Sequence, residues 1–228
     1  LTSNNKELNG KFVNLLGKPK KKDEKFKQKH YDIAWAMQKV FEEICSHMLK
    51  YLHSVSNSKN LVLSGGSFMN SLFNGKAEKL SKFDNAWISS CPDDSGLSIG
   101  AALYLYNNIL GNKKRYILKH NYFGHEFSDK QVLEDLKKYK LKFVYSKNTA
   151  NLISKELQKG KLIGWFQGSM EFGQRSLGNR SILADPRNSK TKDFVNKAVK
   201  YRENFRPFAP SVLDKYANYF FNLKKGET

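Results

Sequence analysis

Residues 60–73 read NLVLSGGSFMNSLF and decide the fold class. A short apolar run, NLVL, predicts a buried strand; two glycines predict a tight turn, and the residues after them predict a helix. Residues 85–110, NAWISSCPDDSGLSIGAALYLYNNIL, repeat the order of strand, loop and helix. Strands that alternate with helices are typical of an α/β domain, so we expect that fold class.

The flanking sequence extends this plan. Apolar residues at three- and four-residue steps predict a helix over 31–54, whereas the polar residues 1–30 predict a loop. The pattern breaks at 111–120, which indicates a boundary between a domain at 1–115 and another at 116–228. We expect the second domain to contain helices from Ser128 to about Tyr139, at 149–159 and at 191–201. Strands are expected at 143–146, 161–168 and 181–185, and an extended segment at 205–213.

Composition limits the classes of protein. The chain has 228 residues and a formal net charge of +19, which favours anionic substrates or a polyanionic partner, although solvated lysines alone would also explain it. The two cysteines indicate no disulfide framework. No apolar run is long enough to span a membrane, so we expect a cytoplasmic protein.

Three local patterns carry chemistry. Glycines 65 and 66 would let a phosphate or ribose approach the backbone, but such junctions are also ordinary turns. PDDSG, residues 92–96, would place a carboxylate for a metal ion or cap a helix. The third pattern is GSMEFGQRSLGNRSILADPR, residues 168–187, in which guanidinium groups among glycines indicate a shaped anion pocket. Its alternative is a loop held by arginine pairs with Glu171, Asp185 and Glu203.

The residues GWFQGSMEFGQRSLGNRSILADPR and VNKAVKYRENFRPFAPSVL resemble the O-carbamoyltransferases, which include nodulation-factor and antibiotic carbamoyltransferases. NLVLSGGSFMNSLFNGK and CPDDSGLSIGAAL resemble the preceding domain of that family, so the resemblance covers about 31–215. It implies the second half of an actin-like ATPase-type domain followed by part of a YrdC-like α/β domain. It also implies a part of a longer enzyme, inactive alone.

The resemblance implies an activity and its ligands. The enzyme would form carbamoyl adenylate from carbamoyl phosphate and ATP, then transfer the carbamoyl group to a hydroxyl of a small molecule. A divalent metal ion, iron or magnesium, would assist. No membrane or nucleic acid is expected as a partner, and a homodimer is left open. Two departures stand out: Ser169 replaces a usual arginine, and the five histidines show no H-x-x-x-H pair for a metal.

The resemblance also assigns roles to residues. The catalytic group is Arg175, Arg180 and Arg206. Carbamoyl phosphate and ATP would be bound by Asn179, Arg187, Lys197 and Arg202, and the nucleotide by Gly65, Gly66 and Asn70. Asp94 would be the metal ligand.

Three rival hypotheses remain. One is an enzyme of the tRNA threonylcarbamoylation type, which the positive charge would suit, but no aromatic and basic RNA platform is visible. Another is a lysine-based polyanion-binding module, and the last is a generic actin-like ATPase, which would not need the arginine motif.

Overall fold

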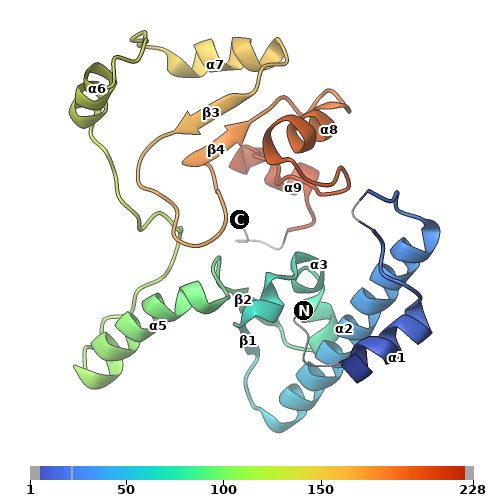
Figure 1. The fold of residues 1–228 in the computed structure, drawn as a ribbon. Coiled ribbons are helices and arrows are strands. Elements are labelled where there is room, and N and C mark those ends of the chain that lie inside the picture. Colours follow the sequence, from blue (N-terminus) through green and yellow to red (C-terminus); the bar gives the residue numbers. More distant parts are fainter. Residues whose placement is uncertain (1–5, 22, 224–228) are drawn as a thin grey trace. The chain divides into compact units, whose positions relative to one another are not determined.

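A computed structural model describes residues 6–21 and 23–223 of the chain (Figure 1). It divides into two compact units, residues 1–94 and residues 95–228. Each unit mixes helices with a two-stranded sheet, as the α/β prediction requires. The predicted division at 115 and 116 stays a prediction.

Two helices open the first unit. Helix α2, Gln28–Val55, confirms the helix predicted over 31–54. Helix α1, Lys6–Leu16, shows that the loop prediction for 1–30 was wrong over these residues. The many Lys and Asn residues favour a loop. Phe12 and Val13 nevertheless lie four and three residues before Leu16, which is the spacing of one helix face.

The parallel strands β1 (Asn60–Leu63) and β2 (Asn85–Ile88) form the sheet of the first unit, with Leu61 opposite Ala86 and Leu63 opposite Ile88 (Figure 1). Short helices connect them: a 3-10 turn at Gly66–Met69, α3 at Ser71–Asn74 and α4 at Ala77–Ser81. Burial alternates along β1, and its buried side chains join one core cluster: Leu49, Leu61, Leu63, Phe73, Ala77 and Phe83. One face of the sheet therefore packs against α2 and the connecting helices.

Four helical segments come first in the second unit. Helix α5, Leu97–Tyr104, continues through a π-helical turn at Leu105–Ile109. Helix α6, Asp129–Lys138, begins with the predicted capping box of Ser128 and Gln131. Helix α7, Thr149–Gln158, stops before Gly160, whose φ of +79° confirms the predicted glycine stop.

Strands β3 (Ile163–Phe166) and β4 (Arg180–Leu183) pair antiparallel, with Phe166 opposite Arg180 (Figure 1). They confirm two of the three strands predicted here. The third, at 143–146, was wrong: no strand forms there, and Val144 and Tyr145 are 89% and 81% exposed. An apolar run becomes a strand only where a second strand supplies backbone partners.

The chain continues after β4 through α8, Thr191–Val195, and a π-helical turn at Asn196–Lys200. Together they match the helix predicted at 191–201. Residues 205–213 contain no helix or strand, and a 3-10 turn at Asp214–Tyr216 leads into α9, Ala217–Phe220. Within residues 6–21 and 23–223, none of the helices has the length and apolar content that a membrane span needs.

Candidate anion-binding site

The loop between β3 and β4, residues 167–179, carries Arg175 and Asn179 of the predicted site, and Arg180 follows it as the first residue of β4. Gly173 and Gly178 have φ values of +100° and +115°, which residues other than glycine rarely adopt. The loop therefore turns where the sequence placed its glycines. Residues 121–125 lie against this loop and are hydrogen-bonded to it. Phe172 N donates to the carbonyl of Asn121 at 2.7 Å, and Met170 N donates to that of His125 at 3.0 Å.

Glu171 organises the far end of this loop. The residue is 8% exposed, and its Oε1 accepts hydrogen bonds from three backbone N–H groups: Leu177 at 2.7 Å, Asn179 at 2.8 Å and Arg180 at 3.2 Å. Burial raises the pKa of this carboxyl, but the backbone donors outweigh burial and leave the pKa below its ordinary value. Within residues 6–21 and 23–223, Glu171 does not pair with a guanidinium, so that part of the alternative prediction was wrong.

Arg180 is held by backbone oxygens. Its guanidinium donates to the carbonyls of Gln167 at 2.6 Å, Asn179 at 2.9 Å and Gly168 at 3.1 Å. It also stacks on Phe166, with 3.6 Å between the guanidinium carbon and the ring centroid. A planar fork suits this combination of stacking and hydrogen bonding. The structure thus gives Arg180 a role in shaping the loop.

The side chain of Asn179 forms hydrogen bonds to other residues of the same loop. Nδ2 donates to the carbonyl of Ser169 at 2.7 Å, and Oδ1 accepts from Gln167 at 3.2 Å. Ser169, at the position where an arginine is usual, donates to the carboxylate of Glu126 at 3.0 Å.

Arg175 lies at the middle of the same loop and is exposed. Across the part of the chain that the structure describes, its side chain makes no hydrogen bond, ion pair or ring contact. Its guanidinium is therefore available to an anion, in contrast to that of Arg180.

The remaining predicted arginines form internal contacts. Arg187 pairs with Asp185, with 2.5 Å between Nη2 and Oδ2, and Arg206 pairs with Glu203 at 2.8 Å. Both pairs belong to the alternative that the sequence left open. The hydrogen bonds from Arg187 lower the pKa of Asp185 to about 2.

A fully buried asparagine, which sequence reasoning missed, organises the segment that follows. Asn196 accepts a hydrogen bond from Arg202 Nε at 2.6 Å and donates to the carbonyl of Arg206 at 3.0 Å. Arg202 also stacks on Phe208, with 4.6 Å between guanidinium carbon and ring centroid. Lys197, next to Asn196, is exposed. Only the tertiary contacts distinguish Asn196 from any other polar helix residue.

The predicted nucleotide residues lie at the carboxyl end of β1. Gly65 has φ +111° and ψ +155°, and its N–H donates to the carbonyl of Pro92 at 2.6 Å. This bond brings the turns after β1 and β2 together, as expected for ligand sites in parallel sheets. Gly66 has open space where a Cβ would lie. Asn70 instead caps α3 through Phe73 N and bonds Gln38 at 2.8 Å.

Asp94 begins a 3-10 turn that precedes α5, whose N-cap residue is Gly96 rather than either aspartate. Over residues 6–21 and 23–223, no group of three or more His, Cys, Asp or Glu side chains is placed to hold a metal ion. Asp94 would therefore supply one ligand only, and the described residues alone do not fit a complete metal centre.

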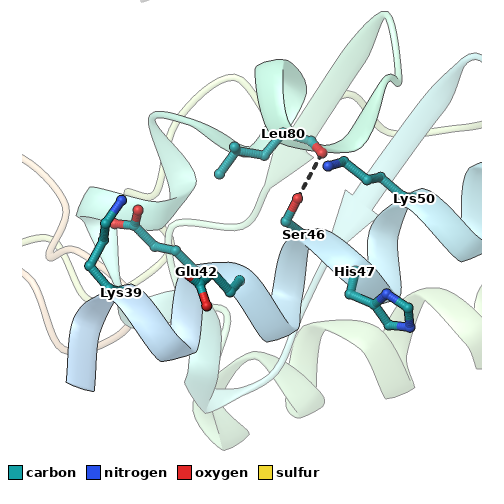
Figure 2. Close-up of a pocket in the computed structure, with 7 residues that line it drawn as sticks. Lys39, Glu42, Ser46, His47, Lys50 and Leu80 are labelled. Carbon is teal, nitrogen blue, oxygen red and sulfur yellow. Dashed lines mark hydrogen bonds between the residues drawn. The ribbon is translucent and has the colours of Figure 1, made fainter. Parts of the chain in front are cut away.

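A separate pocket of about 260 Å³ lies between α2 and Leu80 of α4 (Figure 2). Lys39, Glu42, His47 and Lys50 line it, and Ser46 donates across it to the carbonyl of Leu80 at 3.1 Å. None of the predicted site residues lies in this lining, so the pocket is not the predicted site.

Two family models match the chain and identify the class of protein. Residues 2–103 match the family model described as the carbamoyltransferase N-terminus, and residues 154–228 match that of the carbamoyltransferase C-terminus. The chain belongs to the carbamoyltransferase family, as its motifs predicted.

Individual proteins similar to this chain include a nodulation protein and a cephem carbamoyltransferase. The nodulation protein NolNO of Sinorhizobium fredii is 38% identical over 201 residues, which is 87% of this chain and 30% of the relative. The 3'-hydroxymethylcephem-O-carbamoyltransferase of Streptomyces clavuligerus is 32% identical over 150 residues, 66% of this chain and 27% of the relative. An uncharacterized Synechocystis protein is 37% identical over 222 residues, 93% of this chain and 36% of the relative. The chain spans about a third of the length of these relatives.

Proposed function

We propose that this chain is part of an ATP-dependent O-carbamoyltransferase. The enzyme would form carbamoyl adenylate from carbamoyl phosphate, water and ATP, with release of phosphate and pyrophosphate. A hydroxyl of a small acceptor would then take the carbamoyl group, and AMP would leave. The family membership supports this reaction class, as does the name of the cephem relative.

The observation that carries the proposal is the contrast between Arg175, on the loop of residues 167–179, and Arg180, at the start of β4. Arg180 donates to backbone carbonyls, whereas the exposed Arg175 has no partner among the described residues, so its five N–H donors are available to an outside partner. A guanidinium on a loop that is already ordered is suited to bind a phosphate oxygen and to stabilise charge that develops there. Arg175 would therefore contact the anion directly.

The other predicted residues take roles that follow from their contacts. Lys197 and the free nitrogens of Arg206 and Arg187 would add positive charge, whereas Arg180, Asn179 and Arg202 would keep the binding surface in shape. Gly65 and Gly66 would admit the nucleotide, and Asn70 would support their turn through its cap on α3. These roles assume the YrdC-like and actin-like folds that the motifs resemble.

The metal ion would supply Lewis-acid polarisation when bound. Asp94 would contribute one carboxylate, with the other ligands from outside this chain. The acceptor would be a hydroxylated molecule, and we propose a cytoplasmic location for the enzyme.

The test uses the full-length protein that contains this chain, with carbon-13 carbamoyl phosphate and ATP. Mass spectrometry should detect carbamoyl adenylate that carries the label, together with pyrophosphate. Arg175→Ala should reduce its formation by about tenfold or more, since a charge-assisted hydrogen bond is lost. Release of ADP and phosphate alone would instead indicate a generic ATPase and contradict the proposal.

A further inference from the structure

We call the loop of residues 167–179 the arginine loop. Glu171 is an unexpected residue in it, because nothing in the predicted reaction requires a carboxylate there. Three backbone donors, from Leu177, Asn179 and Arg180, converge on its Oε1 within 3.2 Å. Convergent backbone N–H groups form a concave anion site, of the kind that binds phosphate in other proteins. Here an internal carboxylate already fills that site, so these N–H groups are not available to a substrate.

The bonds from Glu171 close a loop on itself. The carboxylate stands at residue 171 and its donors begin at residue 177, so Arg175 lies inside the closed segment. Gly173 and Gly178 make this segment intrinsically flexible, and ordering it costs conformational entropy. The Glu171 bonds offset that cost before any ligand arrives.

Further contacts hold the same end of the loop. Gln167 N–H and the Arg180 guanidinium both donate to the Asn179 carbonyl, and two more bonds join uncharged groups. Tyr122 Oη donates to the carbonyl of Leu177 at 2.9 Å, and Gly178 N donates to Ser181 Oγ at 3.0 Å. Each is a single hydrogen bond between uncharged groups, which contributes less than bonds to a buried carboxylate. Glu171 therefore contributes three bonds to this end of the loop through one oxygen of a buried carboxylate.

We propose that Glu171 is a positioning residue, whose carboxylate holds the loop of residues 171–180 so that Arg175 is preorganised to bind a substrate phosphate. This inference rests on the proposed function, which makes Arg175 the anion contact. Preorganisation lowers the entropy that a ligand must otherwise offset on binding. Loss of Glu171 should consequently weaken anion binding in the same way as loss of Arg175.

A double-mutant cycle on the full-length protein tests the coupling. Calorimetry measures the Kd for carbamoyl phosphate in wild type, Glu171→Ala, Arg175→Ala and the double variant. Each single variant should raise the Kd by about tenfold or more, and the double variant should raise it no further than Arg175→Ala alone. Independent, multiplying losses would overturn the proposal, as would an unchanged Kd in Glu171→Ala or no binding by wild type.

Two other variants separate positioning from folding. Glu171→Gln keeps an acceptor oxygen and the side-chain length, so it should bind with an intermediate Kd even if Glu171→Ala unfolds. Glu134→Gln, on the exposed surface of α6, removes a carboxylate away from the loop and should bind as wild type. Amide hydrogen exchange at Leu177, Asn179 and Arg180 should quicken in Glu171→Gln and not in Glu134→Gln, and equal protection in both would contradict the proposal.

The results also separate this inference from the function on which it rests. A wild-type protein that binds carbamoyl phosphate with the predicted coupling but forms no carbamoyl adenylate would contradict the proposed reaction and support Glu171 as a positioning residue. A protein that forms the adenylate equally well with and without Glu171 would contradict the positioning role alone.

Discussion

The guanidinium carbon of Arg180 lies 3.6 Å from the centroid of the Phe166 ring, and these two residues face each other as a pair across β3 and β4. The same guanidinium donates to carbonyls of Gln167 and Gly168 just beyond β3. One side chain therefore joins the first residue of β4 to the start of the arginine loop. This relationship makes Arg180 a structural residue whatever else it contacts.

Arg180→Lys should lower the free energy of unfolding of the protein by about 1–3 kcal/mol. Lysine keeps the charge but lacks the planar face and the forked donors. Arg175→Ala is the matched control and should change stability little, since that side chain is exposed and forms no hydrogen bond, ion pair or ring contact in the part of the chain that the structure describes. Urea denaturation of both variants measures the difference, and equal stability of Arg180→Lys and wild type would contradict the structural role.

Gly65→Ala should destabilise the turn after β1 by about 1–3 kcal/mol, because φ +111° with ψ +155° is a conformation that alanine tolerates only under strain. Gly66→Ala is the control: its φ is not in the positive range, and a Cβ there would meet open space. Chemical denaturation should separate the two variants clearly. Similar midpoints for both would show that the turn does not require glycine at position 65.

The Asp185–Arg187 pair predicts a pH dependence of stability. Hydrogen bonds from Arg187 lower the pKa of Asp185 to about 2, whereas an aspartate in an unfolded chain titrates near ~3.9. The carboxylate therefore stabilises the fold above about pH 4, and this contribution is lost as pH falls toward 2. Asp185→Asn should be less stable than wild type at pH 6, and the difference in Tm should shrink between pH 4 and 2. A constant difference would contradict the pairing.

Asn196→Ala should lower the free energy of unfolding by about 2 kcal/mol or more, because it leaves Arg202 Nε and the Arg206 carbonyl without their buried partner. Lys197→Ala, one residue along, changes an exposed side chain and should be nearly neutral in stability. Thermal unfolding of the two variants compares them directly. A neutral Asn196→Ala would mean that the segment at 202–207 is held by other contacts.

Local patterns predicted much of this fold. The apolar periodicity of α2, the Ser128 cap and the glycine stop after α7 act within a few residues of chain, and the structure confirms each. The strand predicted at 143–146 failed because pairing depends on a partner elsewhere in the chain. Helix α1 was missed because polar composition outweighed a short apolar pattern.

The candidate site shows the same division. Motif resemblance selected the arginines, but it did not distinguish the exposed Arg175 from Arg180, whose guanidinium donates to four backbone carbonyls. Glu171 and Asn196 act through backbone groups that lie next to them only after folding. One interpretation of the sequence pairs Glu171 with an arginine, whereas the structure pairs it with peptide N–H groups.

The most direct test of the proposed function is carbamoyl-phosphate-dependent exchange between ATP and labelled pyrophosphate, measured on the full-length protein beside its Arg175→Ala variant. We predict that exchange requires carbamoyl phosphate and falls about tenfold or more in the variant, because the adenylating step loses its exposed guanidinium. Absence of exchange in a folded wild-type protein, or full exchange in Arg175→Ala, would contradict the assignment of this loop to carbamoyl adenylate formation.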